Sequence, residues 1–146
     1  MQAEGKRFPG SFGSAFMYFA AGRTILFREE HSQRVLVPKV EFISAPGWSP
    51  PGVQRRGGPQ ALLTGKALFA WQPAQRRFLL QSVHPAHTAE EVRENTGFDY
   101  AVAPALQQTP TPSREELALL RGPVKSAITE NYPEFAQRVW PLGSAA

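Results

Sequence analysis

Residues 61–84 read ALLTGKALFAWQPAQRRFLLQSVH, and this stretch decides the fold. It contains three short apolar runs, Ala61–Thr64, Ala67–Trp71 and Arg77–His84, and such runs between turn residues are typical of β-strands. The polar segment Gln72–Arg76 predicts a hairpin connection between the last two runs. Near its start the third run is apolar on both faces, which predicts a strand that is covered on both sides.

The residues before this stretch predict more extended structure. Residues 23–44 contain three short runs of β-branched and aromatic residues, Thr24–Phe27, Val35–Val37 and Val40–Ile43. We expect each run to be extended, with Pro38 either bending the chain or marking an edge strand. Together with the later runs, this gives four or five strand candidates for one small sheet.

Helices are predicted downstream of the strands. Thr88, followed three residues later by Glu91, forms a capping-box pattern in which the threonine hydroxyl accepts from a backbone amide and the glutamate reaches back. We expect this helix to end near Asn95, with Gly97 as a left-handed stop. The segment Tyr100–Pro112 is predicted to be a connector.

A second capping box, Ser113–Glu116, predicts a further helix that ends at Gly122–Pro123. Val124–Trp140 then predicts two helices hinged at Asn131–Tyr132, because Pro133 is tolerated best in the first turn of a helix. The fold class predicted from these elements is α/β, with a small mixed sheet followed by C-terminal helices.

The composition bounds the class of protein. A length of 146 residues predicts a single domain over residues 1–146. Hydrophobic residues make up 42% and charged residues 19%, and no apolar stretch reaches the roughly 18–20 residues of a membrane-spanning helix, so neither a disordered chain nor a membrane protein is expected. Cysteine is absent, which excludes disulfides and a Cys nucleophile in this chain and favours a cytoplasmic location.

The charge pattern gives little support to nucleic-acid binding. Sixteen Lys and Arg against twelve Asp and Glu give a net charge of +4, but twelve of the cations are Arg and they are spread along the chain. A nucleic-acid-binding surface usually needs a denser basic stripe on one element. Spread Arg residues favour surface and interface contacts or a phosphorylated ligand.

Two segments are candidate ligand loops. The first is Gly10-Ser11-Phe12-Gly13-Ser14, whose glycines let backbone amides approach an anion, although an N-terminal turn is favoured on spacing alone. The second is the Pro- and Gly-rich loop Ala45–Pro59, in which Arg55 and Arg56 can hold a phosphate or a carboxylate. A solvated loop is the favoured alternative for that pair.

The remaining candidate for chemistry is His84-Pro85-Ala86-His87. Two imidazoles three residues apart suggest a metal, but a zinc site needs a third ligand, so we interpret His87 as a turn residue and predict no metal site. Three acidic pairs are interpreted as helix starts or a solvated turn: Glu29–Glu30, Glu90–Glu91 and Glu115–Glu116. No self-sufficient catalytic set is predicted in this chain.

Several segments, read in order, resemble one known family: Lys39–Gly47, Ser82–Thr88, Glu91–Asp99 and Thr109–Arg121. They resemble the C-terminal half of the β subunit of family I CoA-transferases, of the glutaconate CoA-transferase type. The steroid-ring-degrading CoA hydrolases are similar too. The resemblance extends from about Arg7 to about Trp140, and its most specific piece is His84-Pro85 through Asn95-Thr96-Gly97-Phe98.

The resemblance implies an α/β fold of the sugar-isomerase and CoA-transferase type, assembled from α and β subunits. In that family a Glu near the start of the β subunit attacks an acyl-CoA, and CoA then passes to a second acid. A CoA thioester is accordingly expected as the substrate, with no tightly bound cofactor, and an α-type subunit or a second copy as the partner. The candidate substrate- and CoA-binding residues are Gly10, Ser11 and Gly13, which match the family's glycine loop, together with Arg55 and Arg56 of the second candidate loop.

Two departures from the family pattern bear on activity. The upstream half of the usual β subunit is missing, and none of Glu29, Glu30 or Glu41 matches the nucleophile, so we expect another chain to supply it. In the glycine loop, Phe12 and Phe16 replace a Gly and an Asp. Two alternatives therefore stay open: a non-catalytic homologue that binds acyl-CoA or a partner, and a subunit of a CoA-thioester hydrolase.

Overall fold

The computed structural model describes residues 2–3, 6–7 and 12–141. The chain divides into two compact units, residues 1–109 and residues 110–146, and each is described by itself. The single domain predicted over residues 1–146 stays a prediction. Within the described residues, no helix combines the length and the apolar character that crossing a membrane requires.

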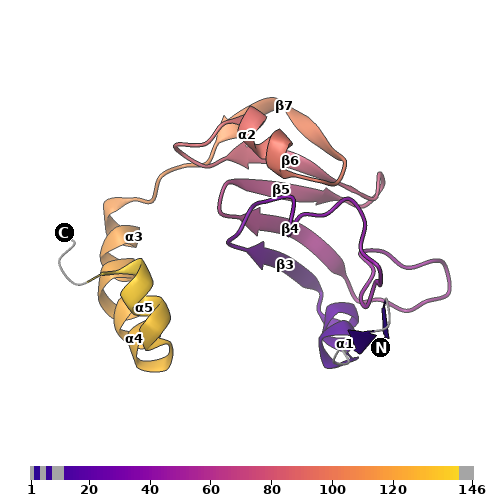
Figure 1. Cartoon of the computed structure of the whole chain (residues 1–146), viewed down its shortest axis with the longest axis horizontal. Coiled ribbons are helices and arrows are strands. Elements are labelled where there is room, and N and C mark those ends of the chain that lie inside the picture. The colour runs from indigo at the N-terminus through magenta and orange to yellow at the C-terminus, as the bar shows by residue number, and fades with distance from the viewer. Residues whose placement is uncertain (1, 4–5, 8–11, 142–146) are drawn as a thin grey trace. The chain divides into compact units, whose positions relative to one another are not determined.

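The first unit is built around a five-stranded sheet with the order β3-β4-β5-β6-β7 (Figure 1). The strands are β3 (Arg23–Arg28), β4 (Gly58–Thr64), β5 (Ala67–Gln72), β6 (Arg77–Val83) and β7 (Tyr100–Gln108). β3 runs parallel to β4 and β6 runs parallel to β7, whereas β5 is antiparallel to both of its neighbours. The predicted mixed sheet is confirmed, and the carboxyl ends of β3, β4, β6 and β7 lie at the same edge.

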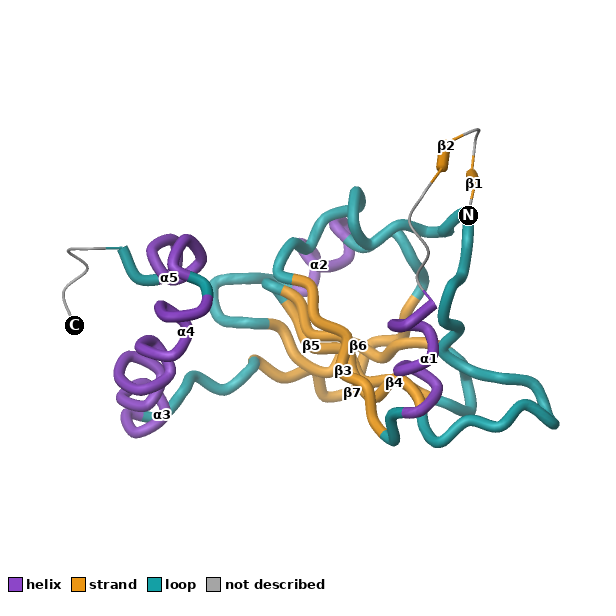
Figure 2. The backbone as a smooth tube through the Cα atoms, turned by 90° about the horizontal axis from the view of Figure 1, so that it is seen from below, coloured by secondary structure: helices purple, strands orange, loops and turns teal. Residues whose placement is uncertain are grey.

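Three smaller elements complete this unit. A short hairpin joins β1 (Gln2–Ala3) to β2 (Lys6–Arg7), and two helices follow along the chain, α1 (Phe12–Ala20) and α2 (Ala89–Asn95). Figure 2 shows α2 and the segment that follows β3 on the same side of the sheet. The hydrophobic core lies between them and the strands.

Phe69 is the centre of this core. Its side chain is 0% exposed, and its ring meets those of Phe98 and Tyr100 at centroid distances of 6.2 and 5.2 Å. Leu80 from β6 and Val92 from α2 are also fully buried. Burial of this apolar surface is the main favourable term in folding the unit.

The two faces of β6 are covered unequally: Ser82, which pairs with Leu68 on the face opposite Phe69, is buried, so the predicted covering on both sides holds only in part. Leu80 is fully buried on the face toward α2, whereas Leu79 is half-buried and Gln81 is exposed on the opposite face. The strand itself is present as the apolar pattern predicts, but within the described residues of this unit no helix covers the second face.

Two predicted extended runs after β3 are also not strands. Val35–Val37 follows a turn in which Val35 and Leu36 donate backbone hydrogen bonds to the Ser32 carbonyl, and Val40–Ile43 is irregular. Leu36 is buried in the core beside α2. The apolar run therefore packs against the face of the sheet and does not pair as one of its strands. Burial rather than strand pairing explains its composition.

The predicted connector Tyr100–Pro112 contains a strand instead. β7 pairs in parallel with β6, and the register shifts between Leu80 and Ser82, opposite the part of β7 that contains Pro104. A proline is tolerated there because β7 is an edge strand and the irregular stretch needs no ladder donor from it.

The turn after α2 differs from the predicted left-handed stop. Gly97 does not take a positive φ; it donates its N–H to the Leu36 carbonyl at 2.7 Å, and an added Cβ would lie 2.5 Å from that oxygen. At the other end of α2 the Thr88 hydroxyl accepts from the Glu91 N–H as predicted. The Glu91 carboxylate does not reach back, because it binds Lys66 and His87.

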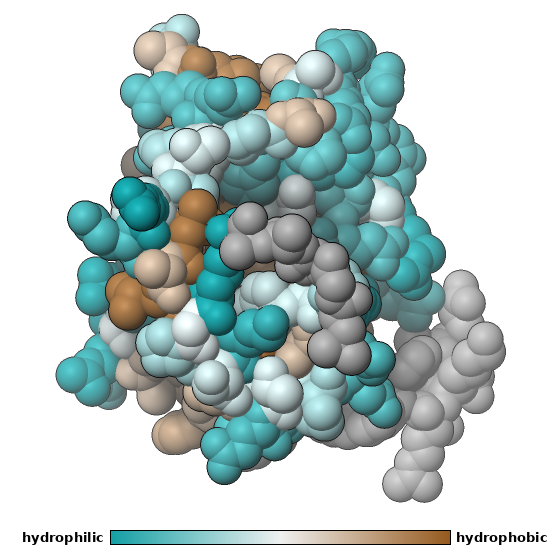
Figure 3. Space-filling model, turned by 90° about the vertical axis from the view of Figure 1, so that its left-hand side faces the viewer, coloured by the Kyte–Doolittle hydropathy of each residue, from teal (hydrophilic) through white to brown (hydrophobic). Residues whose placement is uncertain are grey.

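The second unit is helical, and its predicted boundaries are confirmed. It contains α3 (Arg114–Leu119), a π-helical turn (Leu120–Val124), α4 (Lys125–Asn131) and α5 (Pro133–Val139). Ser113 and Glu116 form the complete capping box, Gly122 leaves the helical conformation, and Tyr132 separates the last two helices. Figure 3 shows hydrophobic side chains, in brown, exposed among hydrophilic ones at the surface of the molecule.

Candidate functional site

The two candidate ligand loops both adjoin α1, but Gly13 and the arginine pair lie at opposite ends of this helix. Gly10 and Ser11 lie outside the described residues, and Gly13 is in the first turn of α1 rather than in a loop. The arginine loop contacts the other end of the same helix, where the Arg56 N–H donates to the Phe19 carbonyl at 3.2 Å. Phe19 comes six positions after Gly13 in the helix, which is about 9 Å along the axis.

Arg55 is the more enclosed member of the pair. Its side chain is half-buried, with the guanidinium carbon 4.5 Å from the centre of the Phe19 ring and 5.5 Å from that of Tyr18. Nη2 donates to the Pro46 carbonyl at 2.5 Å, whereas Nε and Nη1 are buried without a hydrogen-bond partner in the described part of the chain. Buried and unpaired guanidinium donors are costly, so this side chain is poised for an acceptor.

A hollow of about 310 Å³ adjoins Arg55. Its walls come from the loop after residue 45, from the start of β4 and from the end of β5, and they include Trp48, Ser49 and Trp71. The Ser49 hydroxyl is a second buried polar group without a partner among the described residues. Two aromatic rings, a hydroxyl and a guanidinium suit a ligand that combines an apolar part with an anionic group.

Gly57 holds the end of this loop against the turn before β3. A Cβ at Gly57 would lie 1.9 Å from the Gly22 carbonyl oxygen, so only glycine permits the approach. Arg56, two residues before Gly58 begins β4, is exposed to solvent and lines no part of the hollow. The structure therefore separates the two arginines: Arg55 faces the hollow and Arg56 faces solvent.

A second polar cluster lies at the carboxyl edge of the sheet. It brings together all three histidines of the chain with residues that follow β3, β4, β6 and β7: His31, Thr64, Lys66, His84, His87, Glu91, Thr96 and Thr109. Ligands of open α/β sheets commonly bind outside the carboxyl ends of the strands. The sequence predicts only the turn at His84–His87, because the other members are dispersed along the chain.

His31 is the buried centre of this cluster. Its Nδ1 lies 2.8 Å from the Thr64 hydroxyl and its Nε2 lies 2.9 Å from the Thr96 hydroxyl. The Thr96 hydroxyl donates to the Val92 carbonyl, so it accepts from Nε2–H. The single proton of the Thr64 hydroxyl faces both Nδ1 and the Ala67 carbonyl, which lies 3.0 Å away. Burial lowers the pKa of His31, which favours the neutral ring with Nδ1 as an acceptor.

His84 ties the ends of three strands together. Its Nδ1 lies 2.8 Å from the Thr109 hydroxyl, which in turn lies 2.7 Å from the Ser82 hydroxyl, and its Nε2 contacts the Thr64 carbonyl at 3.0 Å. Both ring nitrogens are therefore occupied by structural partners. Within the described residues, no group of three His, Asp or Glu side chains is arranged to hold a metal ion.

Glu91 joins the remaining two basic groups. Its carboxylate binds the Lys66 ammonium through one oxygen and His87 Nδ1 through the other at 2.9 Å. Hydrogen bonds from Lys66 and then from His87 lower the pKa of Glu91 to about 2. The carboxylate is thus held ionised and paired, which makes it a poor general acid or base at neutral pH.

This pairing predicts an acid-sensitive link between β4–β5 and α2. Because the folded pKa of Glu91 is lowered, the stability that the pair contributes is present above pH 4.5 and is lost as the pH falls toward about 2. In a ¹³C NMR titration we expect the Glu91 carboxyl to titrate near pH 2 in the native protein and closer to its ordinary value in Lys66→Met. Identical titration midpoints in the two proteins would contradict the assignment.

Within the acidic pair Glu29–Glu30, the Glu30 carboxylate is already bound by neighbouring side chains. Glu30 accepts from Ser32 at 2.7 Å and from Arg34 at 2.5 Å, and its pKa is lowered, first by the Ser32 hydrogen bond and then by Arg34. Neither Glu30 nor Glu41 lines the Arg55 hollow. No carboxylate nucleophile is presented to the hollow by the described residues that line it.

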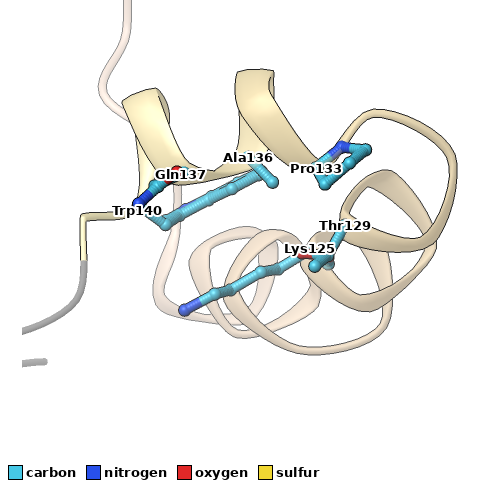
Figure 4. A pocket seen from close by; sticks show the side chains of 6 residues that line it. All are labelled: Lys125, Thr129, Pro133, Ala136, Gln137 and Trp140. Atoms are coloured by element: carbon cyan, nitrogen blue, oxygen red, sulfur yellow. The ribbon is translucent and has the colours of Figure 1, made fainter.

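The second unit has a separate hollow of about 280 Å³ between α4 and α5 (Figure 4). In the close-up, Trp140 and the buried Ala136 line one side of it and Lys125 of α4 lines the facing side. Lys125 is the one ionisable side chain that lines it within the described residues. This hollow lacks a set of groups that would support acid–base chemistry.

No profile of a known protein family matches the chain. Among curated proteins, it is 32% identical over 124 residues to the B-type subunit of glutaconate CoA-transferase from Acidaminococcus fermentans, covering 76% of this chain and 46% of the relative. It is 31% identical over 121 residues to the B-type subunit of 3-oxoadipate CoA-transferase from Pseudomonas knackmussii, covering 79% of this chain and 46% of the relative. The chain therefore spans about half the length of the curated relatives it matches.

Solved structures agree with these relatives. Glutaconate coenzyme A-transferase from Acidaminococcus fermentans matches with a TM-score of 0.67 at 27% identity, over 80% of this chain and 46% of that chain. IpdAB of Rhodococcus jostii matches with a TM-score of 0.61 at 27% identity, over 68% and 42%. The decarboxylase AibA/AibB matches with a TM-score of 0.59 at 27% identity, over 80% and 44%.

The sequence relatives and the shared fold agree with the family resemblance of the motifs around His84 and Gly97. They also agree with the mixed sheet and the helices that follow it. The chain is a homologue of the β subunits of family I CoA-transferases, of the glutaconate CoA-transferase type, over about half the length of such a subunit.

Proposed function

We propose that this chain is a β-type subunit of a cytoplasmic CoA-transferase-like complex that moves CoA between an acyl-CoA and a carboxylic acid. The kinship with two CoA-transferase β subunits at 31–32% identity is the observation that carries the proposal. Its relatives are themselves subunits of larger assemblies, which supports an α-type partner or a second copy for this chain. The chain is proposed to be inactive alone.

The nucleophilic Glu is proposed to come from another chain. A carboxylate oxygen of that Glu attacks the thioester carbonyl, the C–S bond breaks and the CoA thiolate leaves, which forms an acyl anhydride. This assignment is supported by the carboxylates described above: Glu91 is ion-paired, Glu30 is bound by Ser32 and Arg34, and Glu41 does not line the hollow.

Within this chain, Arg55 is proposed as the residue that holds an anionic group of the CoA ester, with Gly10, Ser11, Gly13 and Arg56 as accessory residues. The support is the pair of buried, unpartnered guanidinium nitrogens beside a hollow with two Trp rings. An adenine ring and a phosphate are the apolar and anionic parts of CoA that such a wall suits.

Calorimetric titration with CoA tests this assignment. Arg55→Gln is expected to weaken CoA binding by at least about tenfold, which corresponds to the loss of a charge-assisted hydrogen bond. The matched control is Arg114→Gln, which makes the same side-chain change at an exposed position that does not line the hollow and is expected to alter affinity by less than about threefold. Equal losses in both variants would contradict the role of Arg55.

The transfer reaction is tested with the chain alone and with an α-type subunit co-expressed beside it. An acyl-CoA is supplied with acetate as the acceptor, and the new acyl-CoA and free thiol are measured separately. We expect CoA exchange with the co-expressed complex and no exchange with the chain alone. Release of free thiol without exchange would favour the hydrolase alternative, and CoA binding without either reaction would favour a non-catalytic homologue.

A further inference from the structure

Arg76 stacks on Trp48, one of the two indole rings that line the Arg55 hollow. The guanidinium carbon of Arg76 lies 3.7 Å from the centre of the Trp48 ring, well inside the distance at which an aromatic face attracts a cation. Trp48 lines the hollow and Arg76 does not, so the guanidinium holds the indole from outside and leaves its hollow side to a ligand. The Trp48 side chain is exposed, so this side is accessible from solvent.

The two indole walls of the hollow are held in different ways. Trp71, on β5, is fixed by the sheet, because its ring packs edge-on against Phe78 of β6 at a centroid distance of 5.1 Å. Trp48 lies instead on the irregular loop of residues 45–59, outside the helices and strands. Because Arg76 belongs to the turn between β5 and β6, its contact with Trp48 ties that loop to the sheet.

The backbone of Arg76 shows that the turn itself does not favour an arginine. Its φ is +52°, in the left-handed region, where glycine and asparagine are the usual residues. A residue with a Cβ pays a steric cost there that glycine avoids. The arginine side chain contributes the contact with Trp48, which a glycine would lack.

The size and the lining of the hollow match one end of CoA. A volume of about 310 Å³ is at the lower limit of small-molecule sites, which span about 300–1,000 Å³, so the hollow takes a part of CoA and not the whole. The nucleotide end combines a flat purine ring with phosphate groups, whereas the pantetheine arm has neither a flat ring nor a charge. Aromatic side chains stack on bases, and a guanidinium binds phosphate. Two indoles and the Arg55 guanidinium therefore favour the nucleotide end.

We propose that the hollow is an adenine-nucleotide subsite and that Arg76 is its positioning residue, which holds Trp48 as the stacking wall for the base. Arg76 acts through Trp48 and does not contact the ligand. The inference deepens the proposed function by naming the part of CoA that this chain binds, and it rests on that function for the choice of CoA as the ligand. It does not depend on thioester chemistry.

Direct titration tests which end of CoA the hollow takes. The full chain is titrated with ADP, which carries the purine ring and phosphates, and with pantetheine, which carries neither; calorimetry and tryptophan fluorescence follow binding. We expect ADP to bind and pantetheine to bind at least about tenfold more weakly, because pantetheine offers nothing to stack on Trp48. No binding of ADP, or equal binding of the two compounds, would overturn the inference.

The variant Arg76→Gln tests the positioning role. It removes the cation from the Trp48 face and is expected to weaken ADP binding by about tenfold. The matched control is Arg77→Gln, which removes the same charge from the exposed neighbouring residue and is expected to cost less than about threefold. Equal losses in the two variants would mean that net charge alone is responsible, which contradicts the positioning role.

A double-mutant cycle shows whether Arg76 acts through Trp48. If it does, Arg76→Gln costs about tenfold in the native background and less than about threefold in Trp48→Leu, which has no ring to hold. An equal loss in both backgrounds would overturn the inference. As a second variant, Arg76→Gly relieves the left-handed backbone and is expected to be no less stable in urea than the native protein, so its weaker ADP binding is not an effect of unfolding.

The failure of this inference and the failure of the proposed function give different results. ADP binding that depends on Arg76, without CoA exchange in the co-expressed complex, would support the inference and contradict the proposed function. Exchange by the complex without ADP binding would do the reverse.

Discussion

Replacing Phe69 with alanine is expected to lower the free energy of unfolding by about 3–5 kcal/mol, which is the usual cost of deleting a buried aromatic ring. The ring is 0% exposed and lies between Phe98 and Tyr100, so its removal leaves a cavity as well as losing apolar burial. The free energy of unfolding of a domain is typically about 5–15 kcal/mol, so the variant is expected to be partly unfolded at 37 °C. Urea unfolding followed by tryptophan fluorescence measures the difference.

Phe42→Ala is the matched control for this experiment. Phe42 is 57% exposed in the irregular segment after Leu36, so its truncation is expected to change stability by no more than about 0.5 kcal/mol. A loss at Phe42 equal to the loss at Phe69 would mean that the irregular segment, rather than the sheet, holds the core of this unit.

The strands that can be predicted from the sequence are those with sequence-local partners. β4, β5 and β6 follow one another through short turns, so apolar runs between turn residues are enough to locate them. β7 escapes prediction because its partner β6 is reached only by a parallel crossover through α2, and Pro104 disguises the pattern. Val35–Val37 is mistaken for a strand because an irregular segment that packs on a sheet and a buried strand have the same apolar composition.

The helical unit can be predicted almost completely, because its signals are local. Ser113 and Glu116 cap one helix, Gly122-Pro123 breaks the next turn, and Pro133 begins the last helix. Each signal acts through backbone hydrogen bonds within four residues, so no tertiary contact has to be known.

The sites can be predicted less well. Arg55 and Arg56 are indistinguishable as a pair in sequence, and only the folded loop shows that one guanidinium is enclosed and the other is exposed. The polar cluster escapes prediction because His31, Thr64 and Thr96 are more than thirty residues apart from one another. What assembles them is the common direction of β3, β4 and β6, which no short motif records.

His31 is expected to make the stability of the first unit depend on pH. Burial lowers the pKa of its imidazole below the ordinary value of 6.5, so the folded state binds fewer protons than the unfolded state around that pH. The contribution of the neutral ring is therefore complete above pH 6.5 and is lost as the pH falls through 6.5 toward the lowered value. We expect the denaturation midpoint in urea to fall across this interval.

The variant His31→Gln separates this titration from the loss of the side chain. Glutamine does not titrate but keeps a donor and an acceptor for the Thr64 and Thr96 hydroxyls, so its stability is expected to vary less between pH 7 and pH 5 than that of the native protein. His31→Leu removes both hydrogen bonds and is expected to cost about 1–3 kcal/mol at pH 7, because two buried hydroxyls lose a partner. The midpoint of the His31 ring in an NMR titration is the direct measurement, and a value at or above 6.5 would contradict the neutral, buried network.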